Sequence, residues 1–496
     1  MFVPRVMVVG HCTSVSAAIF CCAESETAGA GAVARLAWRA GPAHGLSDVA
    51  LTAAPPCAVG VHHLAGLPAS AEVTYAIAIA GRGDALPEAD AILARSRPRT
   101  FRLLPVDRPL RVALVTCNGA YEVSDPAQRY VLWPRLRAEI AAGRVDLIIH
   151  GGDQVYSDPL LERYVPKLDD EGGAPPELFG PLLEEFRRIY VEAWTVPEVA
   201  EVLASCPSVM MWDDHDICDG WGSNDADDRP SREVIFRAAR QAFIEFQGSH
   251  NPPGIDPSSF ACAFSHADQA FLLLDGRSHR AYKKERVLGD AQLQAARVWL
   301  AAQPQTLRQL YLVLGIPPVH ANAKFESPFT HQRWLPIHTD FAADLRDGWV
   351  APHNARELGA LMAVLVEFLD THPSTEVTIL AGDVHVGTVG RLERCDAGGK
   401  PDPASGMWQI TSSGIGSPPP AGLMGWLLAM VTRSPMALGA GVSGRLHPVM
   451  PDGKDVLLRR NFAIVGPGEV LFFAEGLDQP LTIALPRRLP GPMPPL

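Results

Sequence analysis

The 496-residue sequence lacks long basic runs, C-x-x-C pairs, internal repeats and low-complexity tracts. Its net charge of -12 argues against a duplex nucleic acid partner, because such binding draws on clustered Lys and Arg side chains that neutralise phosphates. The nine scattered cysteines predict neither a zinc ribbon nor a disulfide framework. The most apolar late segment, Ala421–Val431, is too short to span a bilayer, so it predicts a core or lid helix and no transmembrane segment.

The first twenty-five residues resemble a signal peptide only superficially. His11, Thr13 and Ser14 interrupt the apolar stretch, and a twin-Arg pair is absent. We therefore interpret this region as two β-strands. The lack of a clear signal peptide favours a cytoplasmic location over the periplasm or secretion.

Two kinds of pattern divide the chain. Residues 1–105 hold short β-like segments separated by Gly, Pro, Ser and Asp, which predicts a small antiparallel β-sandwich domain. From Arg111 onward, strand-like runs alternate with helical patterns, which predicts a layered α/β domain over residues 106–496. Hairpin-like segments after about residue 417 are expected to close this second domain. The overall fold class is therefore α/β with an N-terminal β-sandwich.

Three acidic clusters each follow a short apolar, strand-like run. They are GGDQVY at 151–156, WDDHD at 212–216 and AGDVH at 381–385. Carboxylates and imidazoles just past such strands are expected to converge on one edge of a sheet, where α/β folds place ligands. The pattern predicts a metal-dependent site that cleaves phosphoesters.

Hydrolysis of a phosphate ester by a metal-bound hydroxide is most readily supported by two cations about 3.5 to 4 Å apart, with one carboxylate bridging them. Asp153, which follows two glycines, is the candidate bridge. Tyr156 lies three residues further on, and its phenolate suits a hard metal such as Fe(III). Cys117, directly after the run Val112–Thr116, adds a thiolate that the metal itself would deprotonate.

The remaining clusters supply a second metal and a proton donor. Asp214 and Asp383 are oxygen donors for the second metal, and His385 supplies nitrogen to the first. His215 is then free to act as proton donor or to stabilise transition-state charge. Its neighbour Asp216 is expected to orient or polarise that imidazole.

The motif set resembles the PhoD-like alkaline phosphatase branch of the calcineurin-like metallophosphoesterases. The matching segments follow the family's order along nearly the whole chain. They are Val9–Phe20, Thr116-Cys117, GGDQVY at 151–156, WDDHD at 212–216, Leu274–Ser278, GDVH at 382–385 and Arg460–Ala463.

The resemblance implies a β-sandwich domain followed by a four-layer αββα catalytic domain. It also implies action on phosphomonoesters and often phosphodiesters, with iron and calcium as the metals. Carried over by position, the iron ligands would be Cys117, Asp153, Tyr156 and His385. The calcium ligands would be Asp153, Asp214 and Asp383. The expected cofactors are thus Fe(III) together with Ca(II) or another divalent cation.

Several residues keep alternative interpretations. Asp213 is interpreted as a cap or outer acceptor rather than a ligand. Arg277 is a candidate for substrate binding, although an ion pair with Asp275 beneath the site fits the sequence as well. His266 and Asp268 have the H-x-D spacing of mononuclear iron oxygenases.

A degenerate site on the same fold, acting as a binding or scaffold protein, is the main functional alternative. Under the leading hypothesis the partner is a small phosphate ester. The sequence leaves the natural substrate, the choice between monoester and diester, and the oligomeric state open.

Overall fold

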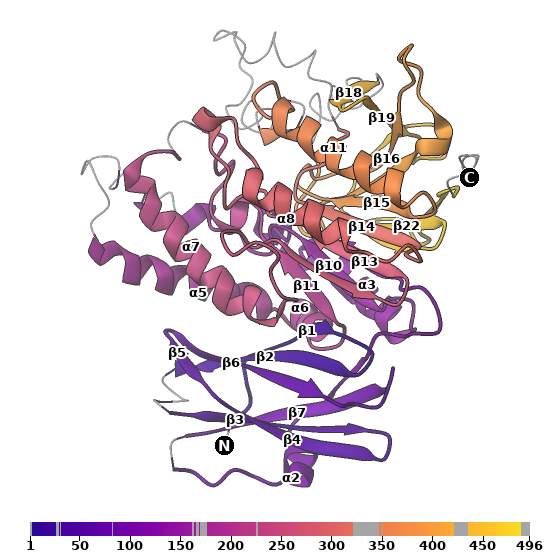
Figure 1. The fold of residues 1–496 in the computed structure, drawn as a ribbon. Helices are drawn as coiled ribbons and strands as arrows, with labels where there is room; N and C mark the ends of the chain where they lie inside the picture. The colour runs from indigo at the N-terminus through magenta and orange to yellow at the C-terminus, as the bar shows by residue number, and fades with distance from the viewer. Residues whose placement is uncertain are drawn as a thin grey trace.

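The computed structural model describes residues 2–487, except for 26–28, 30, 82, 161–162, 165–167, 169–175, 225–226, 321–346, 350 and 421–434. Figure 1 shows a two-sheet β-domain at the N-terminal end and a larger domain of helices and sheets built on it. The helix expected over Ala421–Val431 lies outside the described residues.

The N-terminal domain is a sandwich of two four-stranded antiparallel sheets. One has the strand order β1-β2-β6-β5 and the other β4-β3-β7-β8, with α2 (Ala89–Arg95) packed on the second. The strands are β1 (Val6–Cys12), β2 (Ser16–Glu24), β3 (Val33–Ala40), β4 (Ala43–Ala50), β5 (Thr52–Ala54), β6 (Cys57–Ala65), β7 (Glu72–Ala80) and β8 (Arg99–Arg102). The two strands expected at the N-terminus, β1 and β2, are confirmed and pair with each other.

A six-stranded sheet begins the second domain, in the order β11-β10-β9-β21-β22-β23. Its parallel strands are short and wholly buried, which explains why they are apolar throughout rather than alternating. The strands are β9 (Val112–Val115), β10 (Leu147–Gly151), β11 (Ser208–Met211), β21 (Asn461–Gly466), β22 (Glu469–Ala474) and β23 (Leu481–Ala484). Four helices contribute apolar side chains to the core on the outer face of this sheet. They are α3 (Leu132–Ala141), α5 (Phe179–Trp194), α6 (Pro197–Leu203) and α7 (Glu233–Phe246).

A nine-stranded mixed sheet faces the first one. Along its main path the order is β12-β13-β14-β15-β17-β16-β19-β18, and β20 pairs with β16. The strands are β12 (Cys262–His266), β13 (Gln269–Leu273), β14 (Gln309–Leu314), β15 (Glu376–Ala381), β16 (Gly387–Arg394), β17 (Met407–Ser412), β18 (Met436–Gly439), β19 (Val442–His447) and β20 (Val456–Leu457). Helices α8 (Asp290–Ala301) and α11 (Ala355–Thr371) share the core on its outer face.

The two sheets of the second domain share one apolar core between them. Leu114 and Ile149 from the first sheet belong to the same buried cluster as Phe271, Val313 and Leu380 from the second. With helices on both outer faces, the domain has the layers αββα, and the predicted fold class is confirmed. The domain boundary at about residue 105 stays a prediction. Within the described residues, no helix is both long and apolar enough to cross a bilayer.

Candidate metal centre

The expected ligands come from the carboxyl ends of strands in both central sheets. Cys117 follows β9, Asp153 follows β10 and Asp383 follows β15. Asp214 opens a short 3-10 helix, η4 (Asp214–Asp216), which two residues separate from the end of β11. Because β9, β10 and β11 run parallel, their carboxyl ends lie at one edge, and the facing sheet brings Asp383 to the same place.

The backbone at this edge is held in a conformation that side chains with a Cβ rarely adopt. Cys117, Asp153, Asp383 and His385 have φ values of 53°, 55°, 67° and 52°. They are half of the eight non-glycine residues with positive φ that the described part of the chain contains. Such residues cost about 1–3 kcal/mol each and cluster at functional sites, so four predicted ligands sharing this conformation is strong support for a built site.

The carboxylates form a tight buried group. Asp153, Asp213, Asp214 and Asp383 each place an oxygen within 4.8 Å of the others, and Asp153, Asp214 and His215 form a second such group. Burial, together with neighbouring acidic groups, raises the pKa of Asp153 and of Asp383 well above the ordinary range. Four carboxylates this close cannot all be ionised without cations, so this donor set fits one or more bound metal ions.

A second set of donors has different chemistry and includes Cys117, which contacts Asp153. The Cys117 Sγ is 3.3 Å from Asp153 Oδ2, and the Tyr156 hydroxyl is 3.4 Å from His385 Nε2. Burial raises the pKa of the Cys117 thiol to about 12 and that of Tyr156 well above its usual value, so both need a cation to ionise. Burial lowers the pKa of His385 to about 4, which leaves its imidazole neutral and able to bind a metal.

His215 is held by a carboxylate that the sequence did not single out. Its Nδ1 is 2.7 Å from Asp158 Oδ2, and its ring stacks on Tyr156 with the ring centres 4.1 Å apart. Burial alone would lower the pKa of His215, but Asp214, Asp158 and Asp219 together raise it well above its ordinary value. The only signal for Asp158 was its position five residues after Asp153, in the same turn.

Asp216 does not contact His215 as the sequence suggested. Its carboxylate accepts backbone N–H groups of Asp153 at 2.9 Å and of Asp213 at 3.0 Å, and it also binds Gln247 and Tyr190. This part of the expectation is wrong because a 3-10 turn separates consecutive side chains and directs Asp216 toward the backbone that follows β10. Asp216 instead fixes the backbone that presents Asp153.

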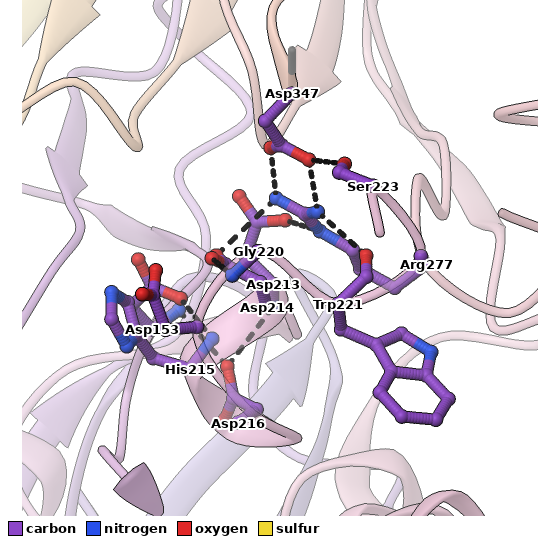
Figure 2. A network of polar contacts seen from close by, with 12 residues as sticks. Asp153, Asp213, Asp214, His215, Asp216, Gly220, Trp221, Ser223, Arg277 and Asp347 are labelled. Atoms are coloured by element: carbon purple, nitrogen blue, oxygen red, sulfur yellow. Dashed lines mark hydrogen bonds and ion pairs between the residues drawn. The ribbon is translucent and has the colours of Figure 1, made fainter. Parts of the chain in front are cut away.

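Arg277 lies at the centre of a buried charge network (Figure 2). The fully buried guanidinium bonds Asp213, lies 3.2 Å from Asp214, and makes two bonds to Asp347 at 2.7 and 2.8 Å. Its fifth N–H donates to the Trp221 carbonyl at 3.1 Å, so all five donors have acceptors.

The prediction of an ion pair between Arg277 and Asp275 is therefore wrong. The Asp275 carboxylate accepts the backbone N–H of Arg277 at 2.9 Å, not its guanidinium. Direct substrate binding by Arg277 stays a prediction, and it would require one of the five existing bonds to open. Asp347 follows a long segment without motifs, so no sequence signal pointed to it.

Asp213 lies among the carboxylates of the candidate metal centre, whereas the sequence suggested a cap or an outer acceptor. One of its oxygens bonds Arg277, while Oδ2 is buried and has no hydrogen-bond partner among the described residues. An unpaired buried carboxylate oxygen is costly, so its position within the carboxylate group fits a cation next to it. Gly152 and Gly315 leave the space that the Asp213 side chain fills.

The iron oxygenase alternative finds no support in this geometry. The His266 Nε2 is 2.7 Å from the Pro105 carbonyl, and Asp268 is exposed. In the part of the chain that the structure describes, neither residue belongs to a group of potential metal donors.

Comparisons with known proteins agree with the motif set. The chain resembles a solved structure of PhoD, with 14% identity and a TM-score of 0.60, over 97% of this chain and 88% of that one. It also resembles the purple acid phosphatase PPD1 from yellow lupin seeds, with 11% identity and a TM-score of 0.53, over 97% and 74%. These likenesses show the shared fold.

A curated relative from Saccharomyces cerevisiae, Uncharacterized protein YGR266W, is 23% identical over 349 residues. The match covers 56% of this chain and spans half the length of the yeast protein. Residues 112–425, which carry all six predicted ligands and His215, match the profile of one family. The chain belongs to the PhoD-like phosphatase family.

Proposed function

We propose that this protein is a metal-dependent phosphatase that hydrolyses phosphomonoesters and also accepts phosphodiesters. The observation that carries the proposal is the convergence of Asp153, Asp213, Asp214 and Asp383 within 4.8 Å, with His215 beside them. Family membership and the metallophosphoesterase fold support a phosphoesterase.

The donors divide into two chemically different halves. Cys117, Tyr156 and His385 offer sulfur, phenolate and imidazole, a set that suits Fe(III), whereas Asp213, Asp214 and Asp383 offer only carboxylate oxygen, which suits Ca(II) or another hard divalent cation. Asp153 contacts Cys117 through its Oδ2 and also belongs to the carboxylate group, so it would be the ligand that both halves share. When bound, the two cations would activate a water molecule and neutralise the phosphoryl oxygens.

The protein's own residues then complete the reaction. Water oxygen bonds to phosphorus as the bond from phosphorus to the ester oxygen breaks, and the departing alkoxide needs a proton. His215 is suited to give it, because its Nδ1 is bound to Asp158 and its Nε2 is left to donate. Burial opposes the charged form of His215, but Asp214, Asp158 and Asp219 together raise its pKa well above the ordinary value, which favours the charged form that can give a proton.

A direct assay tests the proposal. Purified protein loaded with iron and calcium should hydrolyse nitrophenyl phosphate, and bis-nitrophenyl phosphate more slowly. His215→Ala should lower kcat about 100- to 10,000-fold while metal content stays unchanged. His44→Ala, which changes an exposed histidine of the sandwich, is the matched control and should be silent. Bound metals without turnover on either ester would favour the degenerate binding protein instead.

A further inference from the structure

A cavity of about 350 Å³ lies where the sandwich meets the catalytic domain. Its walls come from β8, α3 and α6, and from the residues just before β10 and β11, such as Asp146 and Pro207. The metal centre is built on residues that follow β10 and β11, so the cavity lies at the opposite edge of the sheet. In Figure 1, α6 lies at the side of the catalytic domain that faces the sandwich.

The cavity is rich in arginine although the protein as a whole is acidic. Four guanidiniums and three carboxylates line it. One of the carboxylates, Asp146, is already neutralised by Arg108, which lies outside the lining and makes two bonds of 2.6 and 2.7 Å to it. The remaining charges leave an excess of positive charge in the cavity.

Three of the four arginines lie around one carboxylate, that of Glu201. Glu201 bonds Arg99 and lies 3.2 Å from Arg137 and 3.6 Å from Arg97. One carboxylate cannot satisfy three guanidiniums, which together carry fifteen N–H donors by their chemistry. Donors of the two outer arginines are therefore available to another anion.

Two buried polar groups, one at the cavity and one beside it, have no partner among the described residues. They are the Nε of Arg99 and the hydroxyl of Ser96. Ser96 lines an adjoining cavity of about 150 Å³, which shares Arg97 and Arg99 with the first. An unsatisfied buried donor costs about 1–3 kcal/mol, so an acceptor oxygen brought next to the Nε of Arg99 would relieve that cost in the larger cavity.

We infer that this junction cavity binds a small phosphate-type oxyanion, at a site separate from the metal centre. A tetrahedral anion offers oxygens to Arg97, Arg99 and Arg137 at once, and guanidinium groups match its geometry. Because the walls come from both domains, the bound anion would also join them.

Titration of the metal-loaded protein with inorganic phosphate tests the inference. Calorimetry should resolve a site that Arg97→Ala combined with Arg137→Ala weakens by at least about tenfold, and that weakens with added salt. Competitive inhibition of ester hydrolysis by phosphate should persist in this variant, because it reports the metal centre. Arg39→Ala, an exposed sandwich arginine outside the cavity, should change neither.

The inference is overturned if the double variant binds phosphate with the same stoichiometry and affinity as the parent protein, or if every bound phosphate competes with the ester. A protein without phosphatase activity would still show the site and its loss, so the two proposals fail separately. If the double variant does not fold, Arg97→Ala alone decides, because its side chain is 80% exposed and its removal leaves the packing intact.

Discussion

The Nδ1 of His215 and the Oδ2 of Asp158 lie 2.7 Å apart, and this contact defines how the candidate proton donor is held. The other oxygen of Asp158 accepts the backbone N–H of Asp219 at 2.7 Å. The carboxylate is thus fixed between the imidazole and the loop that follows η4. An imidazole oriented in this way keeps one tautomer and one direction for its second nitrogen.

Replacing Asp158 with Asn should lower kcat by at least about tenfold and shift the pH profile. Burial opposes the charged form of His215, and Asp158 is one of the groups that raise its pKa, so losing the carboxylate lowers that pKa. His215 then loses its proton at a lower pH, so the alkaline limb of the plot of kcat against pH shifts to lower pH. Steady-state rates across pH check this.

Asp216→Asn provides the contrast. Its carboxylate positions the backbone of Asp153 rather than His215, so this variant should lose bound metal and leave the alkaline limb in place. An equal shift of the limb in both variants would contradict the roles assigned to the two carboxylates.

Arg277→Met should destabilise the fold by about 3–5 kcal/mol, because it leaves Asp213 buried without its counter-charge and removes one of the two guanidiniums paired with Asp347, the other being that of Arg280. Thermal unfolding of the metal-loaded protein measures this. The control is Arg297→Met, which removes an exposed pair with Glu367 and should change stability by less than about 1 kcal/mol. A similar small loss at Arg277 would mean that the carboxylates hold protons rather than charge.

Gly315→Ala should disturb the metal centre through Asp213. A Cβ at this position would lie 2.4 Å from Asp213 Oδ2, so the carboxylate must move. We expect weaker metal binding and a stability loss of about 1–3 kcal/mol, measured by metal titration and thermal unfolding. Gly180→Ala, in a helix with open space around the new methyl group, is the control. Unchanged metal affinity in Gly315→Ala would show that Asp213 is not next to a cation.

The fold, and the convergence of Asp153, Asp214 and Asp383, could be predicted from the sequence because both depend on local patterns. Short apolar strands followed by Asp153, Asp214 and Asp383 indicate a parallel sheet edge whatever the rest of the chain does. Asp158 and Asp347 were missed for a physical reason: their roles arise only when distant segments pack together. The role given to Asp216 was wrong because adjacency in sequence does not make two side chains of a 3-10 turn face each other.

Metal removal should make stability strongly dependent on pH. Burial raises the pKa of Asp213 to about 6 and that of Asp216 to about 7, from an ordinary 3.8. The folded state then binds more protons than the unfolded state between about pH 4 and 7, so the chelated protein loses stability as pH rises through that window. The loss should be on the order of a few kcal/mol.

Burial lowers the pKa values of His150 and His250 to about 4. These two histidines therefore make the folded state more stable as pH rises, with or without metal. The informative quantity is therefore the difference between chelated and metal-loaded protein in urea unfolding at each pH. Bound cations keep Asp213 ionised, so this difference should grow from pH 4 to pH 7. A difference that does not change with pH would rule out cations beside Asp213.

Tyr156→Phe should affect the proposed iron site and leave the proposed calcium site unchanged. Its hydroxyl lies 3.4 Å from His385 Nε2 and 2.8 Å from the Ser417 hydroxyl. If a phenolate binds Fe(III) there, the loaded protein absorbs visible light by charge transfer from oxygen to metal, and this band should disappear in the variant. Calcium content, held by Asp214 and Asp383, should remain. Retention of the band, or equal loss of both metals on elemental analysis, would contradict the division of donors between the two sites.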